Sequence, residues 1–182
     1  LQAYRKAWNR CPDLQSCWIK FAVHIQSDKS MASINNKKPE YSTPDESPGF
    51  LLWQVTNIWQ RKIRSSLKGI GITHVQFVLL ASAMWLNDCN KQSTQAAIAK
   101  FSHADAMMTS QVLRALEEKG LVLRVNNSED SRANNITITE DGRNIVEKAM
   151  KVVEDTDSEF FAALEQNMSE FTEMLRNLIS SN

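Results

Sequence analysis

Four side chains between positions 107 and 114 could read the edges of DNA bases. Met107, Ser110, Gln111 and Arg114 share one face of a predicted helix, opposite its apolar face. Serine and glutamine can hydrogen-bond to base edges, glutamine preferably to adenine, and methionine can contact a thymine methyl group. Any exposed helix could also carry Ser, Gln and Arg, and Met107 could simply fill a gap. The elements around this helix favour the base-reading interpretation.

A second group of polar side chains lies in residues 126–133, between two runs of alternating apolar residues. Arg132 is a long cation that could enter a DNA minor groove, where the negative potential attracts a guanidinium. Asp130 could hold that guanidinium or close the turn. The alternative is a surface ion pair, which contributes little to stability. Lys100 and Arg124 are candidates for binding phosphates.

The stretch from residue 95 to residue 142 predicts the framework that these side chains need. It contains a short apolar helix (95–101), a turn (102–104), an amphipathic helix (105–119) and two alternating runs (121–125 and 135–139). Two helices joined by a short turn and followed by a hairpin are typical of a winged helix-turn-helix, which presents one helix to a major groove. DNA binding is therefore the leading hypothesis.

The buried side of the second helix follows from its spacing. Thr109, Val112, Leu113 and Leu116 recur at i, i+3, i+4 and i+7 and should pack on the core. Met108 lies between the two faces and could be core or contact. His103, in the turn, is interpreted as structural.

Capping residues predict where the other helices begin. Thr73 and Gln76 form a capping box, with Ile72 and Phe77 at the positions of a hydrophobic staple. Thr94 or Ser93, Asp105 and Thr139 are predicted to cap later helices. The residues expected to line the inner face of the helix after Thr73 are Val75, Val78, Leu79, Ala83 and Leu86.

Three outer helices are predicted around this framework, over about 47–69, 140–164 and 169–180. Their apolar stripes exceed what one small winged domain needs to cover itself, so a two-fold interface between copies is the simplest way to bury them. The alternative is that they fold back within one chain. The inward positions expected on the long helix are Ile145, Val146, Ala149, Val153, Phe160, Phe161 and Leu164.

The chain resembles the MarR family of bacterial transcription regulators over about residues 47–180. The resemblance rests on Ile98-Ala99, on Leu113-x-x-Leu116-Glu117-x-Lys119-Gly120-Leu121-Val122, and on Asp130-x-Arg132 followed by Ile138-Thr139-x-x-Gly142. It implies a mainly α fold with a small β-hairpin wing: a winged helix-turn-helix over about 72–140, with dimerisation helices over about 47–69 and 140–180. It also implies a homodimer on pseudo-palindromic double-stranded DNA, with Arg132 in the minor groove.

Relatives of this kind respond to small aromatic ligands, so Trp53, Trp59, His74 and Trp85 are candidate ligand contacts. A Trp at helical spacing is more often a core residue, and no effector site is assigned. Peroxide sensing is not supported, because the start of the first helix has no Cys and Cys89 has no obvious basic partner.

Composition limits the classes of function. Among 182 residues, 21 are basic and 21 acidic, so attraction to phosphates must come from local placement of charge. Acidic and basic residues also nearly cancel between residues 100 and 143, which predicts modest affinity for each half-site and makes dimerisation indispensable. The basic group Arg61, Lys62, Arg64 and Lys68 is more readily a solvated helix face than a phosphate site.

Several classes of function find no support in the sequence. Three unpatterned cysteines, Cys11, Cys17 and Cys89, give no metal-ligand spacing and fit a reducing cytoplasm. No nucleophile–base grouping, cofactor motif or membrane-spanning run is found, so we predict neither an enzyme nor a membrane protein. The alternative function is a winged-helix module that binds protein without binding DNA.

The first 46 residues are predicted to be a disordered or non-native extension. The chain begins with Leu1, and Met31-Ala32 resembles a natural start, so residues 1–30 are set aside from the fold prediction. Residues 32–48 are polar and contain proline, as is typical of a mobile leader.

Overall fold

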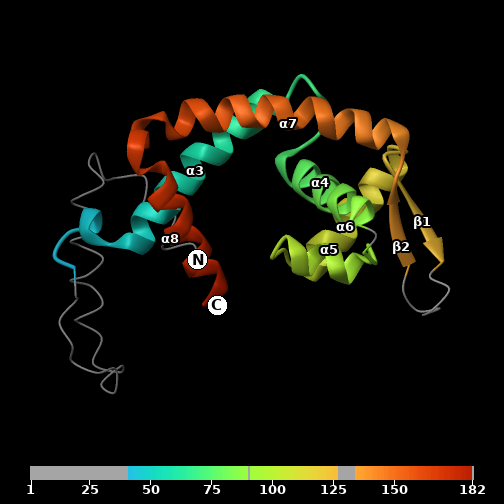
Figure 1. The fold of residues 1–182 in the computed structure, drawn as a ribbon, viewed down its shortest axis with the longest axis horizontal. Coiled ribbons are helices and arrows are strands. Elements are labelled where there is room, and N and C mark those ends of the chain that lie inside the picture. The colour runs from blue at the N-terminus through green and yellow to red at the C-terminus, as the bar shows by residue number, and fades with distance from the viewer. Residues whose placement is uncertain (1–40, 90, 127–133, 182) are drawn as a thin grey trace, which may run out of the picture. The chain divides into compact units, whose positions relative to one another are not determined.

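The structure is a computed structural model that describes residues 41–89, 91–126 and 134–181. It is mainly helical with one antiparallel hairpin, as the sequence predicts (Figure 1). The chain divides between Val55 and Thr56, within α3, into two compact units. In order, the elements are η2 (Pro44–Glu46), α3 (Pro48–Leu67), α4 (His74–Asp88), α5 (Gln95–Phe101), α6 (Ala106–Glu118), β1 (Val122–Asn126), β2 (Asn134–Ile138), α7 (Glu140–Phe161), η3 (Ala162–Asn167) and α8 (Met168–Ser180).

Four predicted N-caps are confirmed by hydrogen bonds. At the start of α4, Thr73 and Gln76 form the full capping box: the Gln76 amide donates to Thr73 Oγ1 (3.2 Å) and the Thr73 amide donates to Gln76 Oε1 (3.1 Å). Each such cap stabilises a helix by about 1 kcal/mol. The other pairs are Ala97 N to Thr94 Oγ1 (3.1 Å), Met108 N to Asp105 Oδ1 (2.8 Å) and Gly142 N to Thr139 Oγ1 (3.0 Å).

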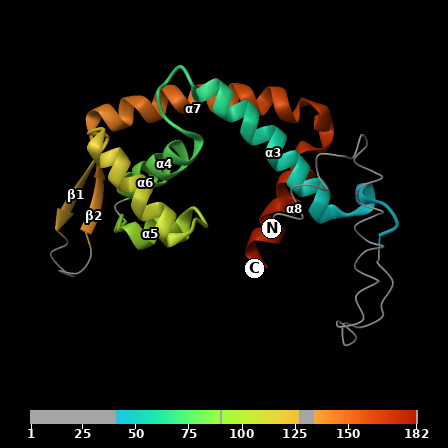
Figure 2. The ribbon, with the colours of Figure 1, turned by 180° about the vertical axis from the view of Figure 1, so that it is seen from behind.

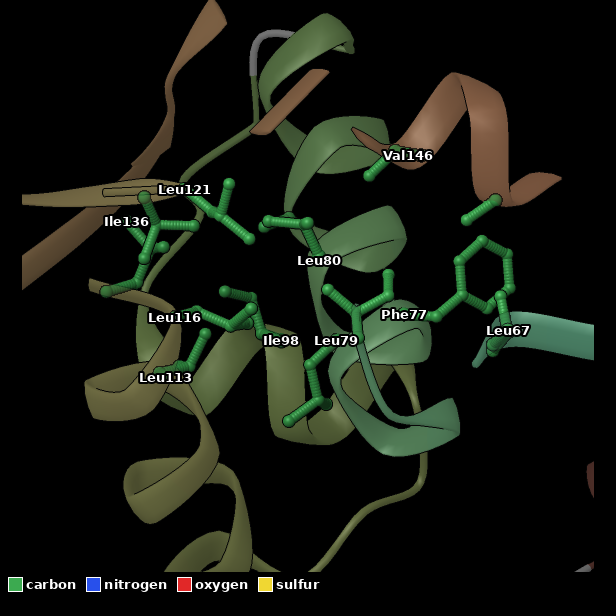
Figure 3. Packing of buried hydrophobic residues seen from close by; sticks show 14 of the residues in the cluster. Leu67, Phe77, Leu79, Leu80, Ile98, Leu113, Leu116, Leu121, Ile136 and Val146 are labelled. Atoms are coloured by element: carbon green, nitrogen blue, oxygen red, sulfur yellow. The ribbon is translucent and has the colours of Figure 1, made fainter. Parts of the chain in front are cut away.

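A single hydrophobic core joins the elements between residues 63 and 153 (Figure 3). Leu79 and Leu80 of α4 lie at its centre and are fully buried. Burying one large aliphatic side chain contributes roughly 1.5–3 kcal/mol, so this cluster dominates the stability of the unit. The other elements contribute, among others, Ile63 and Leu67 (α3), Ile98 (α5), Leu113 and Leu116 (α6), Val122 and Ile136 (the hairpin) and Val146 (α7).

The Thr139-x-x-Gly142 motif now has a physical explanation. Gly142 is buried at the start of α7, and its amide completes the Thr139 cap. A Cβ built on Gly142 would lie 2.1 Å from the main-chain oxygen of Leu121. Only glycine therefore lets the chain leading into β1 pass so close to α7.

The structure corrects the prediction for the end of the long helix. α7 ends at Phe161 rather than Leu164, and η3 follows, with Glu165 at φ 46°. The residue in the left-handed conformation is a glutamate, a type that does not favour it, although Asn167 follows two residues later. Phe160, Phe161 and Leu164 are only half-buried, whereas Val146, Ala149 and Val153 are buried as predicted.

A second correction concerns α4. Val75 was expected to face the core but is exposed, while Leu79, Ala83 and Leu86 are buried as predicted. Val75 occupies the second position of the helix, one turn before the buried Leu79, at an end of α4 that the core does not cover on this side. Ile72 and Phe77, the predicted staple pair, both belong to the core.

The outer helices leave apolar side chains uncovered. α8 has no buried residue, and Met174, Leu178 and Ile179 are exposed along it. Within the first unit, α3 exposes Leu51, Leu52, Trp53 and Val55. Among the described residues, no helix is both long and apolar enough to cross a membrane.

Candidate nucleic-acid interface

The two faces of α6 separate as predicted. Thr109, Leu113 and Leu116 are fully buried. On the opposite face Met107 is 73% exposed, Gln111 and Arg114 are exposed, and Ser110 is half-buried. Met108 and Val112 are partly buried and pack against the core. The polar face is therefore free to contact a ligand. Met108, which could have been a core residue or a DNA contact, packs as a core residue.

The turn before α6 is a Schellman motif with an unusual residue. The Ala104 amide donates to the Ala99 carbonyl (2.9 Å), and the His103 amide donates to the Lys100 carbonyl (3.3 Å). His103 occupies the left-handed position, with φ 50°, where glycine is the common residue. Its role in the structure is to make this turn, which fixes the angle between α5 and α6.

The C-terminal end of α6 uses the same motif with glycine. Gly120 has φ 71° and donates to Glu117 O (2.8 Å), and the Leu121 amide donates to Leu116 O (2.9 Å). Lys119 then reaches back to the connection before α4. Its ammonium donates to the Gly71 carbonyl (2.9 Å) and to Gln76 Oε1 (3.2 Å). The sequence pattern did not reveal this link, because the two ends lie 43 and 48 residues apart.

The wing hairpin begins directly after this turn. β1 pairs with β2 in antiparallel register, with Val122 opposite Ile138 and Arg124 opposite Ile136. Figures 1 and 2 show the hairpin leaving the point where α6 ends and α7 begins. Asp130 and Arg132, the predicted wing-tip residues, lie outside the described residues. Their roles remain predictions.

The second edge of β2 is also occupied. The Ile136 amide donates to the Ser93 carbonyl (2.8 Å). The Asn87 side chain donates from Nδ2 to the Ile136 carbonyl (3.1 Å) and accepts from the Ile138 amide (3.0 Å). The sequence analysis missed Asn87, since nothing in its neighbourhood marks a partner about 50 residues away.

The two phosphate candidates differ in their surroundings. Lys100 is exposed on α5. Arg124 is only 21% exposed at its side chain, and its Nε lies 2.9 Å from Glu117 Oε2. Lys100 is therefore free to bind an anion, whereas Arg124 would have to leave Glu117 first.

The basic face of α3 behaves mainly as a solvated face. Arg61, Arg64 and Lys68 are exposed, and Lys62 lies 3.0 Å from Glu159 Oε1 of α7. This pair is exposed on both sides, so its contribution to stability is small.

The candidate aromatic residues fall into separate environments. Trp59 is half-buried, and its indole nitrogen donates to Asp157 Oδ1 (2.7 Å). The centroids of the Trp59 and His74 rings lie 5.0 Å apart, with the two rings edge to face. Burial lowers the pKa of His74 below its ordinary value, outweighing the nearby Asp157 carboxylate, which raises it. Trp85 is exposed, and within the first unit Trp53 stacks on Phe50 at 6.0 Å.

A cavity of about 480 Å³ lies beside the bend between α7 and α8. Glu154, Asp157 and Glu165 contribute carboxylates, and Phe161 and Met168 contribute apolar surface. Its negative charge disfavours an anionic ligand. Across the described ranges, no group of three or more His, Cys, Asp or Glu side chains is gathered to hold a metal ion.

Comparison with known proteins matches this architecture. A model of the ArnR1-like winged-helix domain matches residues 69–155. The chain is 42% identical over 141 residues to YdcH of Bacillus subtilis, an uncharacterized HTH-type transcriptional regulator, covering 76% of this chain and 96% of YdcH.

Two solved structures show the same fold. A MarR mutant from E. coli, complexed with operator DNA, is 26% identical with a TM-score of 0.63, covering 72% of this chain and 91% of that one. A MarR family protein of Mycobacterium tuberculosis, in complex with salicylic acid, is 29% identical with a TM-score of 0.57, covering 74% and 98%.

Proposed function

This chain belongs to the MarR family of DNA-binding transcription regulators, and from that premise we propose that it is a homodimeric repressor of a pseudo-palindromic operator. The observation that carries the proposal is the split of α6 into a buried apolar face and an open face bearing Met107, Ser110, Gln111 and Arg114. A helix held at both ends and bare on one side is suited to a major groove.

Each residue on the open face has a proposed role. Gln111 is exposed near the middle of α6 and would pair with an adenine edge, assisted by Ser110. Met107, at the N-terminal end, would contact a thymine methyl group. Arg114 and Lys100 would bind phosphates, and Arg132 of the wing would enter the minor groove with Asp130 holding its guanidinium.

Dimerisation supplies affinity that one copy lacks. The chain has no net charge, so its phosphate contacts are few and local. The apolar residues that α8 exposes, Met174, Leu178 and Ile179, give a second copy a surface to bury. Two copies place two recognition helices one helical turn apart on DNA, and their binding energies combine.

Footprinting on the duplex upstream of the protein's own gene tests this function. Gln111→Ala should lose roughly tenfold in affinity and relax base preference at one position in each half-site. Arg132→Ala should weaken binding to all sequences about equally. The matched control is Asn144→Ala, which removes an exposed amide from α7. If the wild type protects no duplex at any salt concentration, the winged-helix protein-interaction module becomes the better function.

We also propose relief of repression by a small aromatic effector, by analogy with the relative solved with salicylic acid. The carboxylate-lined cavity beside α8 is a poor place for such an anion, so the ligand would bind elsewhere. Titration of salicylate against tryptophan emission and operator affinity together tests this point. Saturable quenching that leaves operator affinity unchanged would contradict it. We propose no catalytic activity and a location in the cytoplasm.

A further inference from the structure

Near the C-terminal end of α4, the Asn87 side chain hydrogen-bonds to the wing. This residue is half-buried and forms two hydrogen bonds to the same strand, one to the Ile136 carbonyl (3.1 Å) and one from the Ile138 amide (3.0 Å). A donor and an acceptor presented to residues i and i+2 are what a neighbouring β-strand would supply. Asn87 therefore replaces part of a third strand.

The groups that Asn87 satisfies face away from β1. In an antiparallel pair, successive residues direct their main-chain groups alternately toward and away from the partner strand. Thr139 donates to the Leu121 carbonyl, on the β1 side, whereas Ile136 donates to Ser93 on the opposite side. Ile136 and Ile138 thus belong to the outer edge of β2, where an isolated hairpin would have only water.

A two-stranded hairpin is only marginally stable by itself and needs support to hold one direction. Val122 and Ile136 give it core packing, and two contacts on the outer edge of β2 add hydrogen bonds. They are the bridge between Thr94 and Asn135, which includes the bond from the Ile136 amide to the Ser93 carbonyl, and the Asn87 amide. The bridge is a main-chain contact that most sequences could form. Only the Asn87 contact depends on a particular side chain.

We propose that Asn87 is the residue that positions the wing for its groove, without itself touching DNA. This inference rests on the proposed function, because it concerns how the same DNA-binding surface is held. Loss of the amide leaves a half-buried carbonyl and a half-buried amide unpaired, so the hairpin gives up its direction while the rest of the core stays packed.

Two variants and one control separate this role from general damage. Asn87→Leu keeps the approximate size and removes both hydrogen bonds, and Asn87→Asp keeps the acceptor for Ile138 but loses the donor to Ile136. The control, Asp88→Asn, alters the next residue, whose carboxylate accepts hydrogen bonds from Arg143 of α7 at 2.7 and 3.0 Å.

Amide hydrogen exchange and two kinds of footprinting provide the measurements. In Asn87→Leu the Ile138 amide should exchange at least tenfold faster while amides of α4 and α6 keep their protection. Operator affinity should fall roughly tenfold, and Asn87→Asp should lie between this variant and the wild type. Hydroxyl-radical protection in the minor groove should weaken, with methylation interference in the major groove unchanged. Asp88→Asn should match the wild type in all of these.

Two results would overturn the proposal. The first is faster Ile138 exchange with unaltered operator affinity, which would show that the wing does not need the amide. The second is equal weakening of minor-groove and major-groove contacts, which would show that Asn87 supports the whole domain. Failure of the wild type to bind any duplex is a separate outcome: it would contradict the proposed function, and the positioning claim for DNA would fall with it.

Discussion

α6 and α8 are both amphipathic helices of 13 residues, but they bury their apolar faces in different ways. α6 begins at a side-chain cap, ends in a Schellman motif and places Thr109, Leu113 and Leu116 fully inside its own chain. α8 follows a bend, has no side-chain cap and buries nothing, with Leu178 and Ile179 each 59% exposed.

This difference indicates which part of the molecule is complete in one chain. A helix of 13 residues without caps is marginal in water, so α8 needs an apolar surface against which to pack. α6 already has that surface in α4, α5 and the hairpin. We therefore expect perturbation of α6 to act on folding and perturbation of α8 to act on association, as the following changes test.

The largest effect is expected where α6 enters the core. Leu116→Ala removes a fully buried side chain and should lower the free energy of unfolding by about 3 kcal/mol. Urea denaturation at two protein concentrations measures it. The loss should appear at both concentrations, and a loss confined to the lower one would place Leu116 at an interface instead.

The matching change in α8 should break the dimer. Leu178→Asp puts a charge on an exposed apolar stripe that we propose is covered by a second copy, and it should raise the dimer dissociation constant roughly 100-fold. Sedimentation velocity measures the mass, and circular dichroism checks that the helices persist. Asn177→Asp adds the same charge one residue earlier and should leave the mass unchanged. A wild-type chain that sediments as a monomer would contradict the claim that a second copy covers the apolar face of α8.

An intermediate effect is expected at the contact between α7 and the entry to β1. Gly142→Ala would force a methyl group against the Leu121 carbonyl and should destabilise the fold by roughly 2 kcal/mol, despite the better helix propensity of alanine. Thermal unfolding measures it. An unchanged melting temperature would mean that α7 and β1 can separate without cost.

A smaller and opposite pair of effects is expected at the two ends of the helix-turn-helix. His103→Gly should raise stability by about 0.5–1 kcal/mol, because glycine adopts the left-handed conformation freely. Gly120→Ala should lower it by about 1 kcal/mol for the same reason. Differential scanning calorimetry on both variants gives the two signs, and equal signs would refute the shared motif.

The smallest effect concerns pH and His74. Burial lowers the pKa of His74 in the folded chain below its ordinary value of 6.5. The unfolded chain therefore takes up the proton first, and stability is full above pH 6.5 and declines as the pH falls toward the folded pKa. Urea midpoints at pH 7.5 and 5.5 should differ more for the wild type than for His74→Gln. A wild type that gains stability at pH 5.5 relative to this variant would reverse the sign.

Much of the fold could be predicted because its signals are local. Thr73, Thr94, Asp105 and Thr139 cap helices within three residues of their partners, and the buried face of α6 follows from spacing alone. The bend at Glu165 could not be predicted, because its left-handed backbone occurs at a residue type that does not favour it. The hydrogen bonds between Asn87 and β2 could not be predicted either, because only folding brings this strand close to Asn87.

The candidate site divides in the same way. Exposure of Met107, Gln111 and Arg114 agrees with the predicted open face, but the pairing of Arg124 with Glu117 does not follow from the periodicity of either element. The residue type identified Arg124 as a cation, but only the packing of α6 against β1 shows that Arg124 is already paired with Glu117.

The reach of Lys119 to Gly71 and Gln76 has a mechanical consequence. Lys119 joins the C-terminal end of the recognition helix to the N-terminal end of α4. One helix can slide past the other only if these two charge-assisted hydrogen bonds lengthen or break. We therefore expect these two hydrogen bonds to restrain movement of the recognition helix relative to α4.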